Sequence, residues 1–249
     1  MKYSIISVVN NSYKKFAFVF IKSAIENLNL ENIHEICLLN TGLNNNDVQK
    51  IASLNSKIKI IPSKEVYNSK QSWDHGWQQN VLLKTNFAFS YIQDNNIPTC
   101  MVDIDSMFIN DISDIMKTQG DLVLCDRSDL WGGMPFIASF VGFLNPLKSL
   151  DFINEWREKM NHMFEKGFKT KETPALNELV KYNKKYNILA ASHKMVGLYK
   201  PNLYIEQTRI LHFKGAGDSE NKPLDEAINI RFNRFTSYQH KIKTYLQNV

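Results

Sequence analysis

At residues 100–106 the sequence reads CMVDIDS, an apolar run that ends in two aspartates separated by one residue. In an extended chain, residues i and i+2 point to the same side, so Asp103 and Asp105 present two carboxylates together while Ile104 faces the other way. Adjacent carboxylates repel each other, and a divalent cation such as Mg²⁺ or Mn²⁺ supplies the compensating charge. The segment therefore predicts a strand that ends at a metal site. The alternative, which is common for such a short pattern, is that Asp105 caps a turn and Asp103 is a solvated strand end.

Apolar runs of strand length alternate with helical patterns on both sides of this segment. Strands are expected at 3–9, 34–39, 57–61, 99–104, 121–125, 187–191 and 208–213, and helices at 13–28, 47–54, 78–92, 112–117, 147–164, 173–181 and 231–246. This alternation predicts an α/β fold, a mostly parallel twisted sheet flanked by helices. Ligands bind such sheets beyond the carboxyl ends of strands, where the two aspartates fall. Residues 1–249 are expected to form a single domain, with 223–249 as a C-terminal helical appendage.

The composition is that of an ordinary globular protein, with 249 residues, 43% hydrophobic and 22% charged residues, and a formal net charge of +5. These values exclude a disordered chain or a disulfide-framework protein. The sequence contains no dense Lys/Arg stripe with interleaved aromatic residues, so nucleic acid is not an expected partner. The N-terminal apolar run is too short for a signal peptide, and no run is long enough to cross a bilayer, so a cytoplasmic location is expected.

A second segment, residues 209–217, reads RILHFKGAG and is followed by Lys222 and Pro223. His212 ends an apolar strand, so its imidazole could bind a metal. The glycine-containing loop, with Lys214 and Lys222, could hold a diphosphate through backbone N–H groups and ammonium groups. Considered alone, His212 would more often be a hydrogen-bonded core histidine, and the lysines ordinary solvated charges.

Together these segments resemble the nucleotide-sugar-dependent glycosyltransferases of the GT-A fold, in particular the retaining glycogenin-like and lipopolysaccharide galactosyltransferase-like members. Those enzymes carry an Asp-x-Asp at the end of the fourth strand and a late His-Phe-x-Gly segment followed by Lys-Pro. The resemblance implies a metal-dependent hexosyltransferase that moves a sugar from a nucleotide-diphosphate sugar, with UDP favoured, to a glycan or lipid-linked acceptor hydroxyl. It also implies Mn²⁺ or Mg²⁺ as the cofactor, and it favours retention of anomeric configuration.

The resemblance further implies roles for individual residues. Its motifs make Asp103, Asp105 and His212 the expected metal ligands. The expected donor-binding residues lie at the end of the first strand, in the helix 78–92, in the aspartate motif and in the late loop: Val9, Asn10, Tyr13, Lys84, Asp103, Ile104, Lys214, Gly215 and Lys222.

Several of these donor-binding residues have an equally ordinary structural alternative. Asn10 could instead begin a turn, and Tyr13 could face the core. Lys84 could lie on a solvated helix face. The spacing from His-Phe-x-Gly to Lys222 is longer than is usual in the family, so Lys214 competes with Lys222 for the diphosphate.

Asp105 is expected to act in catalysis through the cation, which would neutralise the leaving phosphate as a Lewis acid. An inverting enzyme also needs a carboxylate base near the acceptor hydroxyl, and Asp129 or Glu172 could supply it. In a retaining enzyme without a covalent intermediate, the departing phosphate oxygen can accept the proton, so no protein base is required.

Two further features could contribute to acceptor or membrane binding. Aromatic loops flank the expected site and could stack on sugar rings or pack in the core; they contain Trp73, His75, Trp77 and Trp131. The closing helix is basic and could lie on an anionic membrane as a peripheral contact, or simply pack on the domain; its cations include Arg231, Arg234, Lys241 and Lys243.

Two other functions remain as alternatives. A haloacid-dehalogenase-like phosphatase also has an Asp-x-Asp after an apolar strand, but here Met107 stands where Thr or Val is expected and the motif lies in mid-chain. A GT-A domain that only binds nucleotide or glycan is the non-enzymatic alternative, and the intact Asp103, Asp105 and His212 argue against it.

Overall fold

The computed structural model describes residues 1–67, 75–130, 132–167, 172–197, 206–215 and 222–247. The strands are β1 Tyr3–Val9, β2 Ile33–Asn40, β3 Ile58–Pro62, β4 Thr99–Val102, β5 Ser106–Phe108, β6 Leu122–Asp126, β7 Phe136–Phe143, β8 Ile188–Ser192 and β9 Ile210–His212. The α-helices are α1 Lys14–Asn27, α2 Asn45–Ala52, α3 His75–Asn95, α4 Ser113–Met116, α5 Pro146–Glu165, α6 Glu172–Lys181, α7 His193–Val196, α8 Leu224–Asn233 and α9 Gln239–Tyr245. Of the predicted aromatic loops, Trp73 and Trp131 lie outside the described residues, as do the side chains of His75 and Trp77.

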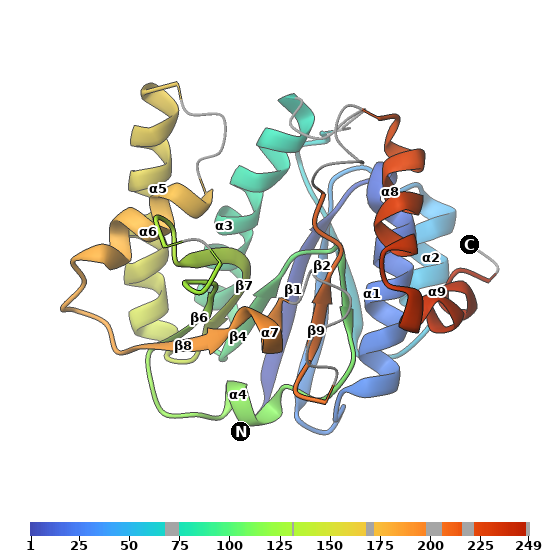
Figure 1. Cartoon of the computed structure of the whole chain (residues 1–249), viewed down its shortest axis with the longest axis horizontal. Coiled ribbons are helices and arrows are strands. Elements are labelled where there is room, and N and C mark those ends of the chain that lie inside the picture. Colours follow the sequence, from blue (N-terminus) through green and yellow to red (C-terminus); the bar gives the residue numbers. More distant parts are fainter. Residues whose placement is uncertain (68–74, 131, 168–171, 198–205, 216–221, 248–249) are drawn as a thin grey trace.

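Within the described part of the chain, seven strands form one sheet in the order β3-β2-β1-β4-β7-β6-β8 (Figure 1). β1 is parallel to β2 and β4, β2 is parallel to β3, and β6 is parallel to β8, whereas β7 runs antiparallel to both of its neighbours. The predicted α/β class with a mostly parallel sheet is therefore confirmed. β5 and β9 pair separately as a short antiparallel ribbon.

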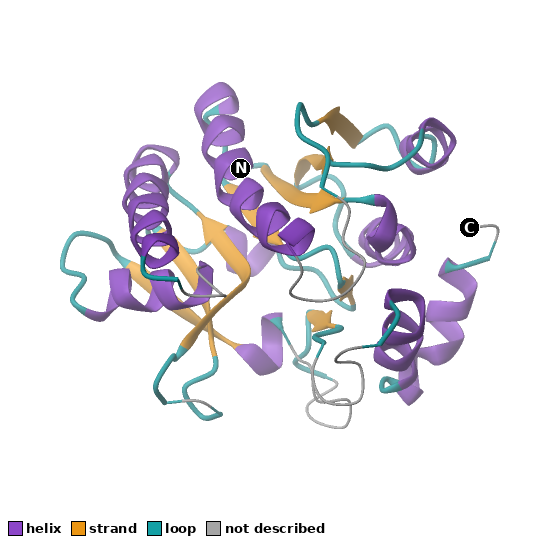
Figure 2. Ribbon diagram, turned by 90° about the horizontal axis from the view of Figure 1, so that it is seen from above, coloured by secondary structure: helices purple, strands orange, loops and turns teal. Residues whose placement is uncertain are grey.

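Helices cover both faces of the sheet (Figure 2). Because successive side chains of a strand point to opposite faces, Ile5 of β1 joins a core beneath α1 while Ile6 joins a second core beneath α3, α5 and α6. Helix α5 begins where the sequence specifies it, since the Asn145 side chain accepts a hydrogen bond from the Lys148 N–H and Pro146 occupies the first turn. The two cores fix β4 in the centre of the sheet.

The segment predicted as one closing helix over 231–246 is two helices, α8 and α9, joined by a 3-10 turn at Thr236–Tyr238. Thr and Ser have low helix propensity, which favours a break at Thr236 and Ser237. The break lets α9 turn onto α1, where the Tyr245 hydroxyl donates to Glu26 at 2.6 Å. Figure 1 shows α8 and α9 beside α1.

A third apolar core joins these closing helices to α1 and to the β5–β9 ribbon. It contains Phe16, Val19, Met107, Leu211, Phe213, Ile228, Phe232, Phe235, Ile242 and Tyr245. Three of the four cations assigned to the predicted basic helix are engaged within the protein: Lys241 pairs with Glu26 at 2.8 Å, Arg234 donates to the Lys214 carbonyl at 3.3 Å, and Arg231 is buried. None of the described helices is both long and apolar enough to cross a membrane.

Candidate active site

Strand β4 ends at Val102, two residues before its predicted end at Ile104. Both aspartates therefore lie just beyond the strand. The chain then enters β5, which pairs with β9 and sets Ser106 opposite His212. The Phe213 N–H donates to the Asp105 carbonyl at 2.8 Å and extends this ribbon. Backbone pairing between segments far apart in sequence therefore brings His212 beside the Asp-x-Asp motif.

Asp103, Asp105 and His212 form a group whose ligand atoms lie within 4.8 Å of one another. His212 Nε2 is 3.6 Å from Asp103 Oδ2 and 3.4 Å from Asp105 Oδ1. Burial raises the pKa of Asp105, but the neighbouring His212 and Arg231 outweigh burial and lower it overall. Carboxylates suit Mg²⁺ and Mn²⁺, and an imidazole suits a transition metal better than Mg²⁺. The donor set of this group therefore fits a divalent cation.

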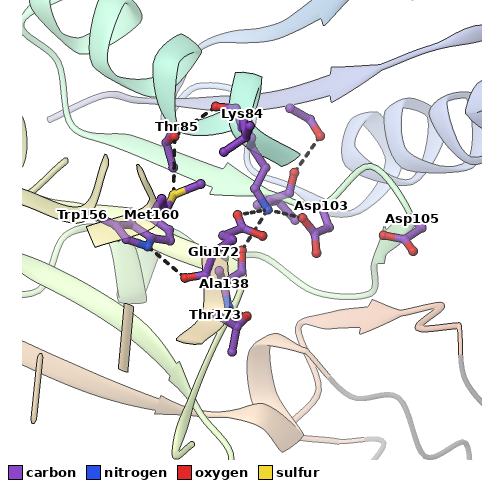
Figure 3. Close-up of polar contacts among 12 residues, drawn as sticks. Lys84, Thr85, Asp103, Asp105, Ala138, Trp156, Met160, Glu172 and Thr173 are labelled. Carbon is purple, nitrogen blue, oxygen red and sulfur yellow. Dashed lines mark hydrogen bonds and ion pairs between the residues drawn. The ribbon is translucent and has the colours of Figure 1, made fainter. Parts of the chain in front are cut away.

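Lys84 lies between Asp103 and Glu172 (Figure 3). Its Nζ is 2.5 Å from Asp103 Oδ1 and 2.6 Å from Glu172 Oε1, and it donates to the Ala138 carbonyl at 3.1 Å. The Lys84 side chain is only 7% exposed, so it does not lie on a solvated helix face. Burial lowers the pKa of Lys84, but the two carboxylates outweigh burial and raise it above its ordinary value. Lys84 thus links a predicted metal ligand to a predicted catalytic carboxylate.

Burial raises the pKa of Glu172 to about 7, and Asp103 adds to this rise while Lys84 opposes it. The folded protein then holds the Glu172 proton more tightly than the unfolded chain does, so the free energy of unfolding should fall as the pH rises from about 4.5 to about 7. Glu172→Gln is expected to remove this component, whose steepest slope is about 1.4 kcal/mol per pH unit. Urea unfolding at pH 5, 6, 7 and 8 measures it.

The exposed Glu178→Gln is the matched control for Glu172→Gln, because Glu178 pairs with Lys159 on the surface with both side chains about 40% exposed. The control should keep the pH dependence of the wild type. An unchanged pH dependence in Glu172→Gln would contradict the raised pKa.

Of the two lysines predicted to contact a diphosphate, the structure places Lys214 near the aspartates. Burial, together with Arg127, lowers the pKa of Lys214, while Asp103 and Asp105 act in the opposite direction. Lys222 instead pairs with Glu226 at 2.6 Å at the start of α8, where both side chains are well exposed.

Arg231 is a site residue that sequence reasoning missed. It belongs to α8, its Nη1 lies 3.6 Å from Asp105 Oδ2, and its side chain is 3% exposed. The signal for its burial was present in the apolar stripe of Ile228, Phe232 and Phe235, which are all buried and which flank Arg231 on one side of the closing segment. The positive charge of Arg231 favoured the interpretation of an exposed basic helix.

Of the residues predicted to hold the base and ribose, Asn10 begins a turn and Tyr13 packs against a neighbouring ring, as in the structural alternatives given above. Asn10 accepts a hydrogen bond from the Tyr13 N–H at 3.1 Å and donates to the Tyr67 carbonyl at 3.1 Å. The ring of Tyr13 packs on Phe16, with centroids 5.6 Å apart. Val9 is buried at the end of β1. Base binding by these residues stays a prediction.

The two candidate bases lie in different surroundings. Glu172 belongs to the buried Lys84 group, whereas Asp129 is 47% exposed and lies 2.9 Å from Lys194 Nζ and 3.3 Å from His193 Nε2. The hydrogen bond from Lys194 lowers the pKa of Asp129. Between the two, Glu172 is the carboxylate that Lys84 joins to the aspartate motif.

A scan of protein families finds no match to this chain, and a search of curated proteins finds none either. Solved structures do match over nearly its whole length. An active-site mutant of LgtC is 13% identical, with a TM-score of 0.63 over 94% of this chain and 95% of that one. The glycosyltransferase GlyE of Streptococcus pneumoniae is 14% identical, with a TM-score of 0.62 over 97% of this chain and 64% of that one. This chain has the GT-A fold.

A third GT-A match is the galactosyltransferase LgtC in complex with donor and acceptor sugar analogues, with 10% identity and a TM-score of 0.59 over 96% of this chain and 99% of that one. The similarity thus spans nearly the whole of this chain. At these identities it establishes the architecture, and the chemistry has to be argued from the residues of the site.

Proposed function

We propose that this GT-A protein is a metal-dependent glycosyltransferase of the hexosyltransferase type. It transfers a sugar from a nucleotide-diphosphate sugar, with UDP favoured, to a hydroxyl of a glycan or lipid-linked acceptor, with retention of anomeric configuration. The observation that carries the proposal is the group of Asp103, Asp105 and His212 at the carboxyl end of β4. The solved relatives support it, since LgtC was captured with donor and acceptor sugar analogues.

In this proposal Asp103, Asp105 and His212 hold Mn²⁺ or Mg²⁺. The bound cation would offset the negative charge that develops on the leaving diphosphate. Lys214, which lies near both aspartates, adds a second positive charge toward the same phosphate oxygens. Lys84 fixes the Asp103 carboxylate from inside the protein through its ion pair.

Retention requires no protein base. Both candidate carboxylates are already held in ion pairs, and this supports a retaining reaction. Glu172 is paired with Lys84, and Asp129 is paired with Lys194. If the reaction inverts the anomeric centre, Glu172 is the better base, because its pKa of about 7 suits proton transfer near neutral pH. The anomeric configuration of the product, measured by proton NMR, distinguishes the two courses.

The test is nucleoside diphosphate release from UDP-, GDP- and dTDP-sugars in the presence of Mn²⁺. Turnover of one of these donors, abolished in Asp105→Ala and kept in the exposed surface control Asp94→Ala, supports the proposal. Hydrolysis of a generic phosphomonoester without any donor turnover would show a phosphatase. Donor binding without turnover would show a domain that only binds nucleotide.

Mn²⁺ together with UDP is expected to stabilise the protein against heat, because a ligand that binds only the folded state adds about 2.7 kcal/mol at 100 times its Kd. His212→Ala should lose most of this thermal shift, since it removes one of three ligands. The exposed His240→Ala is the control and should keep it. Differential scanning fluorimetry measures the shift, and equal shifts in both variants would remove His212 from the metal shell.

A further inference from the structure

We propose that Arg231 of α8 is a positioning residue for Asp105: it holds one carboxylate oxygen of this ligand so that the other oxygen faces the cation. The inference rests on the proposed function, because it assumes that Asp105 binds a metal. It extends that function to the closing helices, whose sequence carries none of the motifs of the site.

The two oxygens of Asp105 have separate partners. Oδ2 lies 3.6 Å from Arg231 Nη1, and Oδ1 lies 3.4 Å from His212 Nε2. The terminal torsion of an aspartate is broad, so its carboxylate turns easily unless a neighbour holds one oxygen. Groups behind a ligand that fix its orientation tune metal affinity in this way. Arg231 therefore defines which oxygen of Asp105 points toward His212.

The guanidinium of Arg231 is itself held in place. Its side chain is 3% exposed, and it forms a hydrogen bond to the hydroxyl of Tyr13. Gly215 packs directly on the guanidinium: a Cβ at this position would lie 2.7 Å from Arg231 Cζ, closer than side chains tolerate. Tyr13, Asp105 and Gly215 come from three distant parts of the chain and enclose one guanidinium.

The charge of Arg231 alone would oppose metal binding, because a positive group near the site raises the electrostatic energy of the bound cation. The benefit of Arg231 must then come from geometry. A lysine keeps the charge but lacks the planar fork that can contact Asp105 and Tyr13 together. Arg231→Lys therefore separates geometry from charge.

The test measures Mn²⁺ affinity by electron paramagnetic resonance on the full chain without nucleotide. We expect Arg231→Lys to weaken the Kd for Mn²⁺ by about 10-fold to 100-fold. In the donor-turnover assay the KM for Mn²⁺ should rise by a similar factor, while kcat at saturating Mn²⁺ stays within about two-fold. Arg209→Lys is the matched control, because Arg209 also pairs with an aspartate, Asp114 at 3.0 Å, and should leave Mn²⁺ binding unchanged.

A second variant approaches the same contact from the other side. Gly215→Ala places a methyl group against the guanidinium and leaves Arg231 in the sequence, so it should also weaken Mn²⁺ binding. The double variant with Arg231→Lys should be less than additive, because both changes disturb one contact. Circular dichroism confirms that each variant is folded.

Each remaining outcome overturns the inference in a distinguishable way. Unchanged or tighter Mn²⁺ binding in Arg231→Lys, with a wild type that binds Mn²⁺ and turns over donor, overturns the role of Arg231 alone. Normal Mn²⁺ binding with weaker UDP binding shows a direct phosphate contact instead. A wild type that neither binds Mn²⁺ nor turns over donor overturns the proposed function together with this inference.

Discussion

Lys84→Met is expected to reduce the free energy of unfolding by about 3–5 kcal/mol. Lys84 is the buried cation between two partly buried carboxylates, Asp103 at 27% and Glu172 at 13% exposure, and methionine leaves both without it. Removing one partner of a buried ion pair costs much more than removing a surface pair, because the remaining charges have lost their hydration. Urea unfolding at pH 8 measures the change, since Glu172 is largely ionised at that pH.

Lys159→Met is the matched control for Lys84→Met. Lys159 also pairs with a glutamate, Glu178 at 3.1 Å, but both side chains are about 40% exposed. Exposed pairs contribute at most about 1 kcal/mol. Adding Glu172→Gln to Lys84→Met should recover part of the loss, because one of the two uncompensated carboxylates becomes neutral. A loss below about 1 kcal/mol in Lys84→Met would show that water reaches this group.

Phe213→Ala is expected to cost about 3–5 kcal/mol of stability. The ring of Phe213 is 1% exposed, and its centroid lies 5.7 Å from Phe16, 4.9 Å from Phe232 and 5.1 Å from Phe235. Alanine leaves a cavity where α1, α8 and the β5–β9 ribbon meet. Thermal or urea unfolding measures the loss.

Phe164→Ala is the control for Phe213→Ala, because Phe164 is 52% exposed at the end of α5. It should change stability by less than about 0.5 kcal/mol. Because Phe213 follows His212, the cavity variant should also weaken Mn²⁺ binding, whereas Phe164→Ala should not. Equal stability losses in the two variants would contradict the packing of the third core.

Sequence periodicity predicts the central sheet well, because burial on both faces requires long apolar strands and helices with apolar stripes. The strands at 3–9 and 121–125 and the helix at 147–164 agree with β1, β6 and α5 to within one residue at each end. The end of β4 differs because the chain leaves the sheet to form β5. This strand has only three residues and depends on pairing with β9, a contact between segments that no local pattern connects.

The residues of the candidate site that belong to a sequence motif could be predicted, whereas those that tertiary packing brings to the site could not. Asp103, Asp105 and His212 follow from their positions at strand ends, and the structure brings them together. The ion pair of Lys84 depends on how α3 crosses β4, and the burial of Arg231 depends on how α8 docks. Both are tertiary properties, which a charged residue in a helical pattern does not reveal.

The contact of Arg231 with Asp105 also has a consequence for the order of events during synthesis. Every strand of the sheet precedes α8 in the chain, so the sheet can form while residues beyond 223 are still being added on the ribosome. Phe232 then packs on Phe16, with ring centroids 4.9 Å apart, and this contact joins α8 to α1. A nascent protein with a complete sheet is therefore expected to reach its full affinity for the cation only after α8 has left the exit tunnel.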